Sequence, residues 1–130
     1  MSTPSTRLTD EQIQATALRI VAEEEALDLL LSGQPSLYAI RRIGERRGPV
    51  KIGFTSVHPQ RRLWRIQRDN PAALEVFKVW PGGDAWAERA IHYRLQQDRI
   101  PYTGEWYRWS SRVALALESE GWRWHRIRLG

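Results

Sequence analysis

The spacing of apolar residues predicts that the chain begins with a helix. Between residues 9 and 33 these residues recur at steps of three, four or seven, which is the spacing of one helix face. Thr9 and Gln12 form a capping box at the start, and Gly33 followed by Pro35 ends the pattern. We therefore expect an acidic, amphipathic helix over residues 9–33. Its apolar face consists of Ile13, Ala17, Ile20, Leu27 and Leu31.

Two short strands joined by a charged turn follow this helix. Residues 36–43 and 49–55 have the composition of strands, and residues 44–48, GERRG, read as the hairpin connection. Side chains alternate between the two faces of a strand. The alternation in the second strand puts Val50, Ile52 and Phe54 on one side and Lys51, Gly53 and Thr55 on the other.

Lys51 is the unexpected residue of this hairpin. It lies on the side opposite the apolar residues of its own strand, and it shares that side with Gly53. A glycine in a strand allows another group to approach the backbone closely. Lys51 is therefore either a solvated lysine or a cation that faces a functional group.

The rest of the chain predicts three more helices and one more strand. We expect helices over residues 59–68, 84–98 and 111–121, a third strand over residues 73–80, and a loop or short extended piece over residues 101–109. This order is typical of an α+β fold in which a small three-stranded antiparallel sheet is flanked by helices.

The length and composition are those of one domain with appendages. We expect residues 1–8 to be disordered, residues 9–33 to form the acidic helix, residues 36–110 to form the main domain, and residues 111–130 to form a helix and a basic, aromatic tail. The chain has no cysteine, which excludes disulfides and thiolate metal sites. No apolar run is long enough for a transmembrane helix, so we expect no membrane association and a cytoplasmic location.

Charge is distributed unevenly along the chain. Residues 1–32 carry a net charge of −4, whereas residues 33–130 carry +9, mostly from arginine. Arginine matches phosphate oxygens in a bidentate manner, so the basic body favours a nucleic-acid partner over a merely solvated surface. The acidic helix is solvated, shields the basic body, or pairs with a second copy of the chain.

Five polar residues have no evident role in a core. Glu88 and His92 are four residues apart, which puts them on one face of their helix. The set supplies a base, two cations and a metal ligand, which is what phosphodiester hydrolysis requires. Its members, which converge if their strands and helices pack on one sheet, are Tyr38, Lys51, Arg62, Glu88 and His92.

Around these residues the sequence resembles the GIY-YIG nuclease superfamily. The closer match is the branch named for the T5 phage orf172 and meiotically up-regulated 113-like domains. LYAI resembles the GIY motif and KIGFT the YIG motif. RRLWRIQRDNPAAL, AERAIHYRL and GEWY resemble the three later motifs of that branch. The resemblance covers about residues 36–110.

The resemblance implies a ββαβα core and a metal-dependent endonuclease with a single-metal site. Tyr38 would be the general base or orient the attacking water, Arg62 would contact the scissile phosphate, and Glu88 would bind Mg²⁺ or Mn²⁺. His92 would be a second polar contact or a proton carrier. Lys51 would replace the usual second tyrosine, adding a positive charge near the phosphate or lowering the pKa of Tyr38.

The substrate implied is DNA, with RNA not excluded, and the alternative is a non-catalytic nucleic-acid-binding module on the same fold. The arginine of the site is either Arg61 or Arg62, and the positions of Leu63 and Gln67 favour Arg62. Residues expected to contact nucleic acid are Arg61, Arg65, Arg68, Lys51, Arg126 and Arg128.

Three further features leave alternatives open. Glu105, in GEWY, is either a site residue or an acceptor that fixes its loop, and the second is favoured. The tail after Gly121 is a nucleic-acid arm, an edge strand or a flap packed by its tryptophans. His58 is expected to be a turn residue or a helix cap, and His125 is expected to be exposed in the tail.

Overall fold

The structure is a computed structural model that describes residues 7–129. The predicted disorder of residues 1–8 falls mainly on residues 1–6, which lie outside the described residues. The elements are α1 (Asp10–Gly33), β1 (Ser36–Arg42), β2 (Val50–Thr55), α2 (Pro59–Arg68), β3 (Leu74–Pro81), α3 (Ala85–Arg94), a 3₁₀ helix (Gln96–Asp98), β4 (Trp106–Tyr107), α4 (Ser111–Leu117) and β5 (Arg123–Arg128).

The strands form one antiparallel sheet in the order β4-β2-β1-β3-β5. The α+β class is therefore confirmed, but the prediction of three strands is wrong, because the sheet has five. The three expected strands form its centre. Strand β4 lies in the segment for which the sequence predicted a loop or short extended piece, because two residues are too short for an alternation pattern. The tail is the edge strand β5, so the alternative of a free nucleic-acid arm is wrong.

The hairpin between β1 and β2 has a register that decides the position of the site. Tyr38 pairs with Gly53, and Ile40 pairs with Lys51. Val50 and Ile52 are buried in the core. The predicted alternation of β2 is confirmed, because directly paired residues share a face of the sheet.

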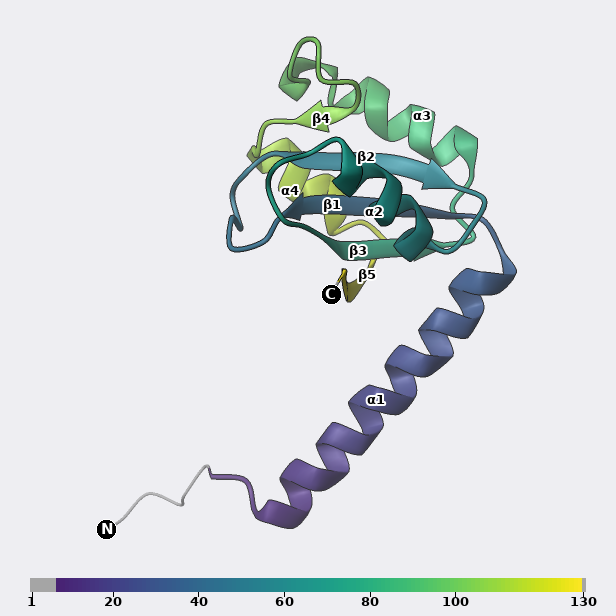
Figure 1. Cartoon of the computed structure of the whole chain (residues 1–130), viewed down its shortest axis with the longest axis vertical. Coiled ribbons are helices and arrows are strands. Elements are labelled where there is room, and N and C mark those ends of the chain that lie inside the picture. Colours follow the sequence, from purple (N-terminus) through teal and green to yellow (C-terminus); the bar gives the residue numbers. More distant parts are fainter. Residues whose placement is uncertain (1–6, 130) are drawn as a thin grey trace.

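The sheet is covered on both faces, so the domain has two clusters of buried side chains. One cluster lies against α3 and α4, and the other lies against α2 and the end of α1 (Figure 1). The first is centred on Leu37, Ala39, Ile52 and Phe77, and the second on Tyr38, Ile40, Leu63 and Val76.

Helix α1 lies against the domain over its C-terminal half, where residues between Ile20 and Leu30 line a pocket together with residues 123–125 of β5. The predicted capping box is present, with hydrogen bonds between Thr9 and Gln12 in both directions. Leu27 and Leu31 are the buried residues of this helix. Its N-terminal part extends away from the sheet (Figure 1), and the apolar side chains of residues 10–26 are largely exposed. Within the described residues, no helix is both long and apolar enough to cross a membrane.

The segment between α2 and β3 is held by the side chain of Gln67. Its Oε1 accepts a hydrogen bond from the backbone N–H of Leu74 at 2.8 Å. Its Nε2 donates to the carbonyl oxygens of Asn70 and Ala72 at 3.1 and 2.8 Å. One amide side chain thus satisfies three backbone groups, and it fixes α2 relative to the central sheet.

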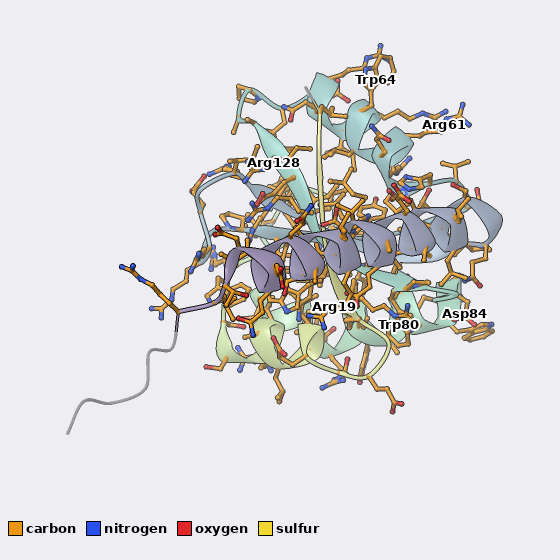
Figure 2. The ribbon with its side chains drawn as sticks, turned by 90° about the horizontal axis from the view of Figure 1, so that it is seen from below. Arg19, Arg61, Trp64, Trp80, Asp84 and Arg128 are labelled. Atoms are coloured by element: carbon orange, nitrogen blue, oxygen red, sulfur yellow. The ribbon has the colours of Figure 1, made fainter. Side chains whose placement is uncertain are left out.

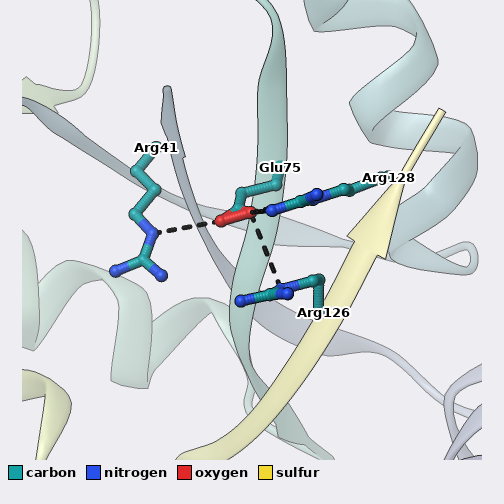
Figure 3. A network of polar contacts seen from close by, with 4 residues as sticks. All are labelled: Arg41, Glu75, Arg126 and Arg128. Carbon is teal, nitrogen blue, oxygen red and sulfur yellow. Dashed lines mark hydrogen bonds and ion pairs between the residues drawn. The ribbon is translucent and has the colours of Figure 1, made fainter. Parts of the chain in front are cut away.

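A buried carboxylate connects three strands. Glu75 on β3 is only 2% exposed and lies between arginines of β1 and β5 (Figure 3). Arg41 donates through Nε at 3.4 Å, Arg128 donates through two nitrogens at 3.1 and 3.2 Å, and Arg126 lies at 3.9 Å. Arg41 also lies 4.3 Å above the ring of Phe77. This network fastens the edge strand β5 to the sheet.

Replacing Glu75 with glutamine should lower the free energy of unfolding by about 2–3 kcal/mol, because it leaves a cluster of arginines without its carboxylate. Urea denaturation measures this loss. The exposed Glu120→Gln is the matched control and should behave as wild type. An unchanged unfolding midpoint for Glu75→Gln would contradict a structural role for the network.

Candidate active site

The five residues singled out in the sequence come from four elements that meet beside β2. Tyr38 lies on β1, Lys51 on β2, Arg62 on α2, and Glu88 with His92 on α3. The charges of Arg62 and Glu88 act on both Tyr38 and Lys51. These side chains are therefore close neighbours in the folded protein.

The absence of a side chain at Gly53 makes room for the phenol of Tyr38. A Cβ atom built at Gly53 would collide with the ring and hydroxyl of Tyr38. The two residues are direct partners across the β1–β2 pair. Gly53 therefore allows another group to approach the backbone closely, as the sequence predicted, and that group is the phenol of Tyr38.

The hydroxyl of Tyr38 accepts a hydrogen bond from Arg62. Nε of Arg62 lies 3.3 Å from Oη of Tyr38. Burial raises the pKa of Tyr38, although the hydrogen bond from Arg62 acts in the opposite direction. Tyr38 is therefore a neutral phenol at neutral pH, and the cation that favours its phenolate is Arg62. By contrast, Arg61 is exposed and points away from the body on the outer side of α2 (Figure 2).

Lys51 is half-buried and faces carboxylates. Burial lowers its pKa, whereas the charges of Glu105 and Glu88 raise it and that of Arg62 lowers it. The downward direction of the shift means that the loss of hydration outweighs the attraction of the two carboxylates. A solvated surface lysine would not show this balance.

Glu88 lies in the first turn of α3, close to a second carboxylate. Asp84 is the N-cap of this helix, and its side chain accepts a hydrogen bond from the N–H of Ala87 at 2.9 Å. Burial and the charge of Glu105 raise the pKa of Glu88, and a backbone hydrogen bond from Phe54 lowers it. Glu88 therefore has the environment of a carboxylate that gains from a nearby cation.

The sequence reading did not favour Glu105 as a site residue, yet its side chain lies in this cluster. Its Oε1 is 3.4 Å from Nδ1 of His92. Single ligand atoms of Glu88, His92 and Glu105 all lie within 4.8 Å of one another. In the sequence, only the GEWY motif pointed to Glu105 as a candidate. The pairing of β4 with β2, which brings Glu105 next to His92, is too short to be predicted from the sequence.

The other expected nucleic-acid contacts are divided between two regions. A cleft of about 270 Å³ beside the site is lined by Arg61, Arg62 and Arg65, together with residues 54–57. Arg68 lies over the exposed ring of Trp64 at 5.0 Å. Arg126 and Arg128 are on β5, at the opposite side of the sheet from β2 and β4, and both face Glu75.

The two remaining histidines bind one carboxylate of α1. His58 caps α2 as expected, since its Nδ1 accepts from the N–H of Gln60 at 3.0 Å. His125 is buried, so the expectation of an exposed residue is wrong. Nε2 of His58 and Nε2 of His125 lie 3.1 and 2.9 Å from the same oxygen of Asp28. These contacts attach α1 to both α2 and β5.

A strand tyrosine held by a helix arginine, with a helix glutamate nearby on a small antiparallel sheet, is the arrangement expected of a nuclease-associated, GIY-YIG-like domain. The family model of the T5orf172 domain matches residues 36–120, and the chain therefore belongs to the T5orf172 domain family. The match extends beyond residue 110 and includes α4. No curated protein and no solved structure matches the chain.

Replacing Gly53 with alanine should displace the ring of Tyr38 and lower the free energy of unfolding by about 1–3 kcal/mol, as overpacking does in other cores. Chemical denaturation provides the measurement. The matched control is Gly33→Ala, because a Cβ at Gly33 meets nothing within 4 Å. If both variants were as stable as wild type, the close contact over Gly53 would be refuted.

Replacing Lys51 with methionine should stabilise the protein at neutral pH. The pKa of Lys51 is lowered in the folded state, so the charged form is penalised at every pH below that lowered value. The free energy of unfolding of the wild type then rises as the pH increases from the lowered pKa of Lys51 to its ordinary value of 10.5. Over this pH range the difference in stability between the variant and the wild type becomes smaller.

Denaturation of Lys51→Met and wild type at neutral and alkaline pH tests this prediction. Arg47→Met is the control, since it removes one positive charge from the exposed hairpin. If Lys51→Met is less stable than wild type at neutral pH, the attraction between Lys51 and its neighbouring carboxylates outweighs the cost of burying its charge, and the prediction is wrong.

Proposed function

We propose that the protein is a metal-dependent endonuclease that hydrolyses phosphodiester bonds in DNA. The observation that carries this proposal is the hydrogen bond from Arg62 to the buried Tyr38, close to Glu88 and Lys51. The basic cleft beside this pair and the membership in a nuclease-associated family support it.

Arg62 is the proposed phosphate-binding residue. Its Nε is bound to Tyr38, and in the described part of the chain no hydrogen bond is found for its two terminal nitrogens. A guanidinium group can donate both of these to the oxygens of one phosphate. Arg61 and Arg65, which line the same cleft, would hold the neighbouring phosphates of the backbone.

Tyr38 is proposed to orient the attacking water. Its hydroxyl oxygen accepts from Arg62, so its own proton is free to be donated elsewhere. The raised pKa of Tyr38 favours this role over that of a general base at neutral pH. Lys51 would place a positive charge where the phosphate becomes more negative during the reaction.

The donor set fits a divalent cation, since two carboxylates and an imidazole offer ligand atoms within 4.8 Å of one another. Glu88 would hold Mg²⁺ or Mn²⁺. When bound, such an ion neutralises charge on the phosphate and lowers the pKa of a coordinated water. The position of Glu88 in the first turn of α3, next to Glu105, supports this proposal.

A plasmid-nicking assay with Mg²⁺ or Mn²⁺ tests the proposal, comparing wild type with Glu88→Gln, Tyr38→Phe and Arg62→Gln. Loss of one charge-stabilising group in an active site typically costs about 10²–10³ in rate, and we expect losses of this order. Glu120→Gln, far from these residues in sequence and exposed, should cleave as wild type. Activity that survives both Glu88→Gln and Tyr38→Phe would refute the assignment.

The rival function is a module that binds nucleic acid without cutting it. A mobility-shift assay in the presence of a chelator measures binding alone, because binding does not require the metal, and the nicking assay with divalent ions then shows whether the bound nucleic acid is cut. Salt-sensitive binding with no cleavage under any divalent ion would establish the rival function. RNA of the same sequence, used in the same assays, tests the choice of DNA.

A further inference from the structure

The ring of His92 has the hydrogen-bonding arrangement that is common for histidines that bind metals. Its Nε2 lies 2.8 Å from the carbonyl oxygen of Ile52. A carbonyl oxygen can only accept a hydrogen bond, so Nε2 carries the hydrogen and donates it. Histidines that bind metals commonly donate their other ring N–H to a backbone carbonyl, which fixes the tautomer and the direction of the free nitrogen.

The second ring nitrogen is directed at the carboxylate of Glu105. Nδ1 of His92 lies 3.4 Å from Oε1 of Glu105. The ring is also stacked on Tyr107, with centroids 5.7 Å apart and an angle of 30° between the planes. In the neutral ring, Nδ1 has a lone pair that faces another acceptor. A cation between the two groups would satisfy both.

The backbone holds Glu105 in this place. The N–H of Ile52 donates to the carbonyl oxygen of Glu105 at 3.4 Å, and the next residue, Trp106, pairs with Lys51. The preceding loop is closed by a hydrogen bond from Arg99 to the carbonyl oxygen of Gly104 at 2.9 Å. Glu105 is thus fixed by the sheet itself, next to the strand residue that fixes His92.

The third ligand atom belongs to Glu88, one helical turn before His92. A carboxylate oxygen of Glu88 lies within 4.8 Å of a carboxylate oxygen of Glu105 and of a ring nitrogen of His92. Lys51 offsets part of the repulsion between the two carboxylates, because Glu105 and Glu88 both act on it. Two carboxylates and an imidazole nitrogen therefore point at one position.

We propose that Glu88, His92 and Glu105 together bind one divalent ion, with Nδ1 of His92 as a nitrogen ligand, and that the site consequently prefers Mn²⁺ or a similar transition-metal ion to Mg²⁺. The inference rests on the proposed function, which assigns only Glu88 to the metal. Mg²⁺ is bound almost entirely through oxygen, whereas imidazole favours transition metals.

The ligand set is tested by titrating Mn²⁺ into the protein and following the electron paramagnetic resonance signal of the free ion. The variants are Glu88→Gln, Glu105→Gln and His92→Gln, with Glu120→Gln as the matched control. Glutamine at position 92 keeps an amide that can donate to the carbonyl oxygen of Ile52. Thermal denaturation without metal checks that each variant is folded.

We expect Mn²⁺ to bind the wild type and Glu120→Gln equally, and each site variant to bind about tenfold or more weakly, since even outer contacts of metal sites cost about that much. Competition by Mg²⁺ should require a large excess in the wild type and less in His92→Gln. Electron spin-echo modulation of bound Mn²⁺ should contain an imidazole nitrogen signal in the wild type. This last measurement needs no variant.

Two results would overturn the proposal in different ways. If Mn²⁺ binds without an imidazole signal, and only Glu88→Gln weakens it, then His92 and Glu105 form an ion pair that fixes the loop and Glu88 binds the metal alone. The proposed endonuclease function would survive that outcome. If Glu88→Gln binds Mn²⁺ as the wild type does, the metal site is elsewhere, and the proposed function fails together with this inference.

Discussion

The packing of one phenol ring over one glycine is the constraint on which the site depends. Tyr38 can lie on the face of the sheet next to β2 only because Gly53, its direct partner, has no Cβ. Its hydroxyl then reaches the guanidinium group of Arg62 on α2. The helix is held in turn by Leu63 in the core and by Gln67 at its C-terminal end. The absence of a side chain at Gly53 therefore determines how Tyr38 of β1 meets β2 and contacts Arg62 of α2.

Around this contact the protein keeps charges that burial disfavours. Burial opposes the ionised forms of Tyr38, Lys51 and Glu88 alike. Such a cluster lowers the stability of a fold unless its members pair with one another. Groups with shifted pKa values are therefore found mainly at functional sites, where the chemistry needs them. The contrast is Glu75, which is more deeply buried but surrounded by arginines. Glu75 is therefore neutralised by its neighbours, whereas Lys51 and Glu88 beside β2 keep pKa values that burial has shifted.

The sequence was sufficient wherever a local pattern decides the structure. The alternation of β2, the cap of α1 and the start of α2 at Pro59 follow from neighbouring residues, and each is present. It was insufficient where the deciding partner is distant. His125 is buried because Asp28, which is 97 residues away, accepts its hydrogen bond. Strand β4 has two residues, so only its pairing with β2 defines it.

Glu105 illustrates why the site was harder to predict than the fold. Its motif allowed two interpretations, an acceptor that fixes its loop or a site residue, and the motif alone does not decide between them. The backbone of Glu105 is bound to Ile52, while its side chain faces His92. Because the carbonyl oxygen of Ile52 also receives the hydrogen bond from His92, one residue of β2 aligns both partners. A short edge strand thus brings one more carboxylate next to the candidate site, through main-chain hydrogen bonds that depend little on the side chains involved.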